Sequence, residues 1–179
     1  MKELALHILD VAQNSISAGA RRLALALDAR DNVLTVSLAD DGCGMSPELL
    51  AAVTSPFTTT RTTRKVGLGL PLLRLAAEQT GGRLSVESAP GRGTTVTAVF
   101  HTGHIDCPPL GDLAGTLALV VQGSPRLTLS CRHTTPLGSY FFSTEQVRGM
   151  LGPDIPLDTP EVILWLTEYL RELEQSVTT

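Results

Sequence analysis

The sequence predicts an α+β fold, because it contains helical and strand-like patterns in alternation. Near the amino terminus, apolar residues recur at helical spacing, at Ala5, Ile8, Leu9, Ala12 and Ile16. Farther along, apolar and polar residues alternate in the stretches 34–39, 83–88 and 94–100. Such alternation is typical of strands with one buried face.

Composition excludes several classes of protein. The 179 residues are 42% hydrophobic and 18% charged, an ordinary globular balance, and the net charge of −4 offers no basic surface for a nucleic acid. No apolar run approaches the roughly 20 residues of a membrane helix, and the first residues do not resemble a signal peptide. Three scattered cysteines indicate no disulfide framework. We therefore expect a soluble cytoplasmic protein with no nucleic-acid or membrane partner.

The first helix, about residues 2–17, carries polar residues on the face opposite its apolar one: His7, Asp10, Asn14 and Ser17. A solvated face is the simplest alternative, but such faces usually carry lysine, glutamate and arginine. Short polar groups suit a cleft instead. Asn14 supplies an amide oxygen, a hard ligand suited to Mg²⁺. Asp10, one turn earlier, is placed to orient or deprotonate a water.

Two strands follow, about residues 22–27 and 33–39, and the second ends in the turn Asp40-Asp41-Gly42-Cys43-Gly44-Met45. A carboxylate at a strand end, here Asp40, can accept a hydrogen bond from the exocyclic amine of adenine. Gly42 and Gly44 let the backbone turn sharply and approach a flat ligand. A plain glycine-rich turn is the alternative for this hexapeptide taken alone.

Residues 54–66 are rich in hydroxyls and cations, a composition that suits a cover over an anionic ligand or, alternatively, a solvated connection. The next four residues, Gly67, Leu68, Gly69 and Leu70, lead into a helix predicted over 71–80. A helix amino terminus preceded by glycines is a ready phosphate site, because its free N–H groups and its dipole face the anion.

The remainder changes character after a hairpin over 83–100. A proline-rich linker at 107–109 precedes a helix over 112–122, strands over 126–132 and 140–143, and helices over 144–150 and 160–175. We recognise no catalytic spacing there. The expected division is therefore a domain over 1–103 and a small mixed α/β segment over 104–179, which is a candidate partner or homodimer interface.

Four motifs in order carry a resemblance to a known family. The runs Asp10 to Asn14, Asp40 to Gly44, Gly67 to Leu70 and Gly93-Thr94 resemble the N, G1, G2 and final Gly-Thr boxes of the GHKL superfamily. That superfamily comprises gyrase-type ATPases, Hsp90-type chaperones, histidine kinases and mismatch-repair ATPases. Pro56-Phe57 looks like its F box. The stretch 67–100 looks most like a histidine-kinase catalytic domain.

The resemblance implies a Bergerat fold, a two-layer α/β sandwich with helices over one face of a mixed sheet. It implies Mg-ATP in a cleft between the first helix, the Asp40 turn and a 54–66 lid. Asn14 would coordinate Mg²⁺ and Asp40 would bind the adenine amine. The other implied nucleotide contacts are Gly42, Gly44, Lys65, Gly67, Leu68, Gly69 and Leu70, with Thr94 supporting Asp40 through a shared water.

The resemblance also frames the function. Asp10 lies where gyrase-type ATPases place a catalytic glutamate, and its side chain is one methylene shorter. No helical hairpin bearing a phosphoacceptor histidine precedes the N box, and His7 fits a cleft-lining role better than that of a phosphoacceptor. We therefore expect an ATP-dependent, kinase-type module that phosphorylates a separate protein. The alternative is a nucleotide-gated protein-binding module or slow ATPase without kinase activity.

Overall fold

The computed structural model describes residues 3–55 and 69–179. In sequence order, the first part contains α1 (Leu4–Ser17), β1 (Arg22–Arg30), β2 (Val33–Asp40), α2 (Pro47–Thr54), α3 (Gly69–Gln79), β3 (Arg83–Ser88) and β4 (Thr94–His101). The second part contains α4 (Leu113–Gly123), β5 (Thr128–Thr135), β6 (Gly138–Ser143), α5 (Thr144–Leu151) and α6 (Pro160–Thr178).

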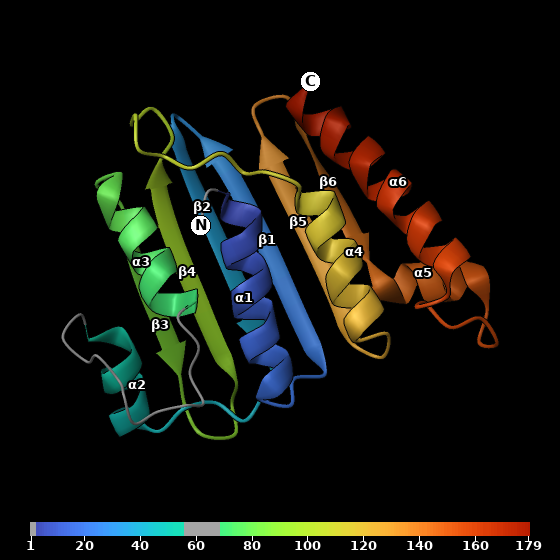
Figure 1. The fold of residues 1–179 in the computed structure, drawn as a ribbon, viewed down its shortest axis with the longest axis horizontal. Coiled ribbons are helices and arrows are strands. Elements are labelled where there is room, and N and C mark those ends of the chain that lie inside the picture. Colours follow the sequence, from blue (N-terminus) through green and yellow to red (C-terminus); the bar gives the residue numbers. More distant parts are fainter. Residues whose placement is uncertain (1–2, 56–68) are drawn as a thin grey trace.

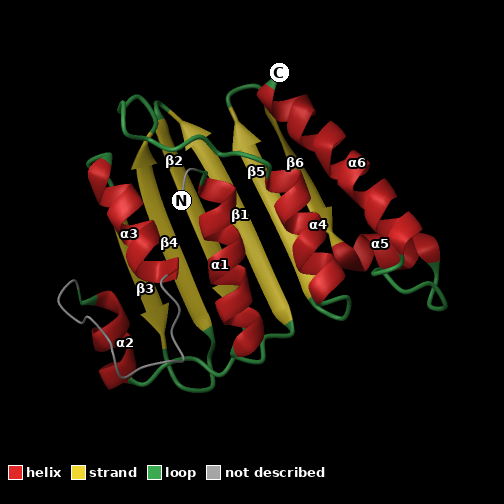
Figure 2. Ribbon diagram, in the orientation of Figure 1, coloured by secondary structure: helices red, strands yellow, loops and turns green. Residues whose placement is uncertain are grey.

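The strands form one six-stranded sheet in the order β3-β4-β2-β1-β5-β6. The β1–β5 pair is parallel, whereas each other neighbouring pair is antiparallel. Helices α1, α3, α4 and α6 lie side by side over one face of this sheet (Figure 1, Figure 2). The mixed sheet with helices on one face confirms the predicted α+β class and is consistent with a Bergerat fold.

The first hairpin is tighter than the sequence pattern suggests. We expected residues 28–32 to connect two strands, but β1 continues to Arg30, which pairs with Val33. Only Asp31 and Asn32 form the turn, with φ angles of 51° and 61°. Aspartate and asparagine tolerate this left-handed region better than most residues, and two-residue hairpins need it. The expected connection was therefore too long by three residues.

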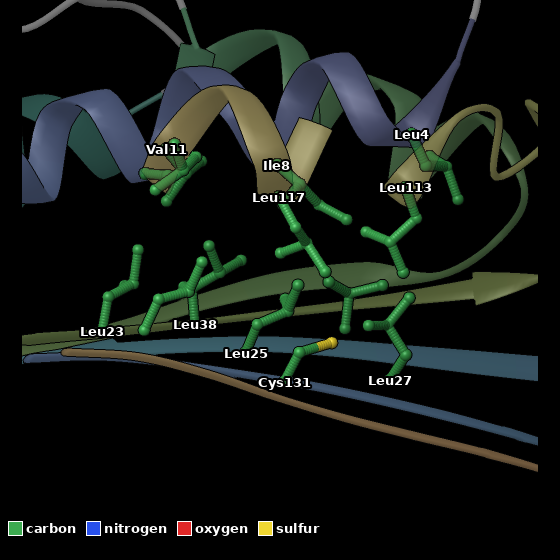
Figure 3. Close-up of a cluster of buried hydrophobic side chains, with 14 of the residues drawn as sticks. Leu4, Ile8, Val11, Leu23, Leu25, Leu27, Leu38, Leu113, Leu117 and Cys131 are labelled. Atoms are coloured by element: carbon green, nitrogen blue, oxygen red, sulfur yellow. The ribbon is translucent and has the colours of Figure 1, made fainter. Parts of the chain in front are cut away.

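The segment after residue 103 shares both sheet and core with the segment before it. Figure 3 shows side chains from α1 and α4 packing together over the strands. The buried side chains that meet there are Leu4, Ile8 and Val11 of α1, Leu113 and Leu117 of α4, and Leu23, Leu25, Leu27, Leu38 and Cys131 of the sheet. The division at residue 103 stays a prediction, since a shared sheet does not say whether either part folds alone.

A largely buried polar network attaches α6 to strands β5 and β6 at one edge of the sheet. Glu174 Oε1 lies 2.8 Å from His133 Nδ1 and also accepts a hydrogen bond from the Tyr140 hydroxyl. Burial raises the pKa of the Tyr140 hydroxyl, and the neighbouring Cys131 and Glu174 raise it further. Burial likewise raises the pKa of the Cys131 thiol to about 12. Tyr140 and Cys131 are therefore uncharged, and Glu174 supplies the acceptor that the buried groups need.

Replacing Glu174 with leucine should destabilise the protein. The change leaves the buried His133 and Tyr140 groups without their acceptor, and an unsatisfied buried polar group costs about 1–3 kcal/mol. We expect the free energy of unfolding in urea to fall by roughly 3 kcal/mol. The exposed Glu172 of the same helix gives the matched control, Glu172→Leu. Equal stability of the two variants would contradict a structural role for the network.

Candidate functional site

The polar face of α1 lies against the start of α3. A Cβ built on Gly69 would be 2.9 Å from Asp10 Cβ and 3.7 Å from Asn14 Nδ2. The glycine therefore lets the amino terminus of α3 approach α1 at the level of these two side chains. The structure thus brings the predicted residues of the N box and the second half of the glycine motif into one place.

Asn14 keeps part of its amide unpaired. Its Nδ2 atom is buried, and no residue in the described part of the chain accepts a hydrogen bond from it. A half-turn of the amide would present Oδ1 at the same position, so this end can serve a ligand as donor or a hard cation as acceptor. The site thus fits Mg²⁺ in chemistry, and Asn14 is the residue that would hold it.

Asp40 ends β2 on the face that α1 covers. The Ser15 hydroxyl donates to Asp40 Oδ2 at 2.6 Å, and the Gly42 N–H donates to Asp40 Oδ1 at 2.9 Å. Both carboxylate oxygens are therefore fixed in direction, while the side chain remains only half-buried. Because Ser15 follows Asn14 directly, α1 positions the Asp40 carboxylate and the Asn14 amide together.

The glycines of the Asp40 turn make close contacts with neighbouring backbone. Gly44 has a φ of +69°, and a Cβ there would lie 1.9 Å from the Ala89 carbonyl oxygen. A Cβ on Gly93 would lie 1.9 Å from the Asp40 carbonyl oxygen. At Gly42 the nearest atoms, Ala18 O and Asp40 Oδ1, would each be 3.0 Å away. In this structure the missing side chains of Gly44 and Gly93 make room for backbone that packs against the turn.

Thr94 lies opposite Asp40 in the β2–β4 register. Its hydroxyl is 2.9 Å from Ser88 Oγ, which in turn donates to the Gly93 carbonyl and accepts from the Met45 N–H. Ser88 therefore links the hairpin turn to the Asp40 turn. Thr94 is next to the site, and the protein group that its hydroxyl contacts is Ser88.

The remaining predicted residues divide into two sets. Leu70 is described, and its side chain is buried in the core, so any contact with a ligand would come from its backbone. Lys65, Gly67 and Leu68, together with the F-box residue Phe57, lie outside the described residues.

His7 of α1 is buried, at 2% exposure, and its Nδ1 atom is unpaired among the described residues. Burial lowers the pKa of the His7 imidazole.

Two residues of the site were missed in the sequence. Ser15 looked like part of the helix end, although its helical spacing from Ile8 and Val11 places a hydroxyl on the buried face. Asp41 Oδ1 accepts backbone N–H bonds from Arg21 at 2.7 Å and Arg22 at 2.8 Å. These bonds, chiefly that from Arg22, lower the pKa of Asp41. The Asp40 turn is thereby tied to the start of β1.

Comparisons with known proteins agree with this geometry. A family model described as histidine kinase-, DNA gyrase B-, and HSP90-like ATPase matches residues 2–104. The sensor protein kinase FleS of Pseudomonas aeruginosa is 40% identical over 96 residues, which cover 52% of this chain and 23% of that protein. The sensor histidine kinase ZraS of Klebsiella oxytoca is 36% identical over 93 residues, 50% of this chain and 20% of that protein. The chain spans about a fifth of the length of these curated relatives.

In the described part of the chain, no helix has the length and apolar character that crossing a bilayer requires.

The Asp41 carboxylate should stabilise the fold only when it is charged. Its pKa is lower in the folded state, so its contribution is fully present above the pKa of the unfolded chain and disappears as pH falls through the folded value. We expect Asp41→Asn to lower Tm at pH 7, and its Tm difference from the wild type to shrink as the pH falls below the ordinary aspartate value of about 3.9. The exposed Asp154, changed to Asn, is the control. A Tm difference for Asp41→Asn that does not change with pH would contradict this role.

Proposed function

Since the chain belongs to the histidine kinase-, DNA gyrase B- and HSP90-like ATPase family, we propose that it binds Mg-ATP and transfers the γ-phosphoryl group to a separate protein. The observation that carries the proposal is the meeting of three motifs along α1, with the fourth, Gly93-Thr94, beside Asp40 in the sheet. Asp10, Asn14 and Gly69 lie together on one side of α1, and Ser15 holds Asp40 on another.

In this proposal Asp40 recognises the adenine base. Its carboxylate is aimed by Ser15 and by the Gly42 N–H, so it can accept a hydrogen bond from the exocyclic amine without first reorganising. A carboxylate end that is only half-buried remains accessible to a base. Thr94, opposite Asp40 in the sheet, would support this end of the site, with Gly42 and Gly44 shaping the turn beside it.

The phosphates would lie at the other end, by the amino terminus of α3. Gly69 begins that helix, whose free N–H groups favour an anion. Asn14 Nδ2 lies 3.7 Å from a Cβ placed on Gly69, and Asn14 is the residue that would hold Mg²⁺. When bound, Mg²⁺ would neutralise phosphate charge. Asp10 is placed beside the same glycine, where it can orient or deprotonate a water or an acceptor hydroxyl. Lys65, Gly67 and Leu68 complete the proposed contacts.

A second function rests on Asp10. If Asp10 activates a water, the chain would hydrolyse ATP slowly, or use ATP to gate a protein interaction, without passing the phosphoryl group on. The two functions make different demands on the same carboxylate. Steady phosphate release that Asp10→Asn abolishes would favour the ATPase, whereas labelled protein would favour the kinase.

Nucleotide binding is tested by calorimetry on the wild type and two variants. Asp40→Asn replaces a charged acceptor by a neutral one, so we expect ATP binding to weaken by about 1.5–3 kcal/mol, roughly tenfold to a hundredfold in Kd. Asn14→Ala should mainly remove the difference between binding with and without Mg²⁺. Asp28→Asn, on the same sheet but at the far end of β1, is the control. Unchanged affinity in Asp40→Asn would exclude the proposed adenine contact.

Phosphotransfer is tested with γ-labelled ATP. We expect label to appear on a protein other than this chain when the two are incubated together, and to fall when Asp40→Asn replaces the wild type at an ATP concentration below the Kd of the variant, because nucleotide binding is weakened. The measurement is protein-bound label after separation on a denaturing gel, with α-labelled ATP as the control for nucleotide adhesion. Tight ATP binding with no protein-bound label, in the presence of candidate acceptors, would leave the ATPase or gated binder as the better account.

A further inference from the structure

An open hollow of about 370 Å³ lies between the end of α1 and the connection from α4 to β5. Ile16, Ala20 and Arg21 form one wall, and residues 124–127 form the other. None of these residues belongs to the proposed nucleotide site. The first wall lies within the family match over residues 2–104 and the second lies beyond it, so the hollow exists because the second segment joins the sheet.

Parallel pairing of β1 with β5 creates the hollow. Arg22 pairs with Thr128 in the register, and the Thr128 N–H donates to the Arg21 carbonyl at 2.9 Å. The residues just before the two strands, Arg21 on one and Arg126 and Leu127 on the other, therefore leave the sheet side by side. This places two arginines at the same end of the sheet.

The second wall is held in shape by side chains behind it. The Arg148 guanidinium of α5 donates to the carbonyls of Pro125 and Leu127, each at 2.9 Å. The Leu127 N–H donates to the Ser124 carbonyl at 3.0 Å. These hydrogen bonds hold the backbone of residues 124–127 in one conformation. A ligand that binds there therefore loses less free energy to ordering the loop.

The hollow carries positive charge with no internal counterion. Arg21 and Arg126 are exposed, and no acceptor for either guanidinium lies among the residues that the structure describes. The neighbouring Arg22 is paired with Glu145 at 3.5 Å. Asp41 is the nearby acid, and its carboxylate accepts the backbone N–H groups of Arg21 and Arg22. No acidic residue lines the hollow itself, although the chain as a whole has a net charge of −4.

We propose that this hollow docks an acidic segment of the partner protein, one in which carboxylates flank an apolar side chain. Guanidinium groups bind carboxylates through paired, charge-assisted hydrogen bonds. The apolar side chain would pack on Ile16 and Pro125, which line the hollow together with the two arginines. The hollow is open rather than enclosed, which suits a segment of a protein better than a small molecule that must be buried.

The docked segment would lie beside the nucleotide turn. The Cys43 N–H donates to the Ala18 carbonyl at 2.9 Å, so residues 18–21 contact the Asp40 turn at one end and line the hollow at the other. This proposal rests on the proposed function in one respect, because it takes the docked partner to be the phosphoryl acceptor. Binding at the hollow itself does not require ATP.

The test is an NMR titration of the full chain, without nucleotide, by the blocked peptide Glu-Leu-Glu-Leu-Glu. We expect the backbone amide signals of Arg21 and Leu127 to shift and to saturate. The isosteric peptide Gln-Leu-Gln-Leu-Gln should bind roughly fivefold to tenfold more weakly, as should the acidic peptide to the double variant Arg21→Gln/Arg126→Gln. Because the titration omits ATP, a failure of the peptide to bind would not count against nucleotide binding. A failure of ATP to bind would likewise not count against peptide binding at the hollow.

A variant with the same change in net charge supplies the control. Arg83 on β3 and Arg132 in the second half of β5 are exposed and do not line the hollow, so Arg83→Gln/Arg132→Gln should bind the acidic peptide as the wild type does. Equal loss in both double variants would show general attraction and overturn the site. So would equal binding of the two peptides. Inorganic phosphate forms a separate arm, and shifts of the same amides by phosphate with no response to the peptide would overturn a protein segment as the ligand.

Discussion

The hydrogen bond from Ser15 to Asp40 joins the two layers of this protein at the proposed nucleotide site. At 2.6 Å, it fixes a carboxylate at the end of β2 to a hydroxyl on the buried side of α1. The residue before Ser15 is Asn14, so the same helical turn sets the position of the amide that faces Gly69. A shift of α1 along its axis would therefore move both ends of the site at once. The geometry proposed for the purine and for the phosphates depends on this one contact.

The candidate positions at Asp40 and Gly69 could be named from the sequence because they belong to motifs that occur in a recognised order. Asp40 at a strand end and Gly69 at a helix start stand out from their surroundings. Ser15 and Asp41 could not be predicted in the same way, since a serine near a helix end and an aspartate in a turn are ordinary residues there. Their importance comes from partners about 20 residues or more away in sequence, which local pattern does not contain.

The strands and the hairpin over 83–100 could be located, but the order of the strands in the sheet could not. Alternation at Leu23, Leu25 and Leu27 tells which side of β1 is buried, and it gives no sign of the strand that lies beside it. The expected linker at 107–109 and the change of motif content after residue 103 suggested a separate unit. In the structure, Leu25 pairs with Cys131, more than 100 residues later, in the parallel register that also forms the arginine-lined hollow.

The continuous sheet also determines which surfaces a shorter fragment of this chain would expose. Cutting it at the limit of the family match would remove β5 and leave β1 with a free row of N–H and C=O groups along the whole strand. The same cut would uncover the leucines that α4 now shields from water. A bare strand beside an uncovered apolar surface invites pairing between molecules. A recombinant fragment ending near residue 104 would expose this edge and this apolar surface to solvent, although it contains the four motifs that resemble those of the family.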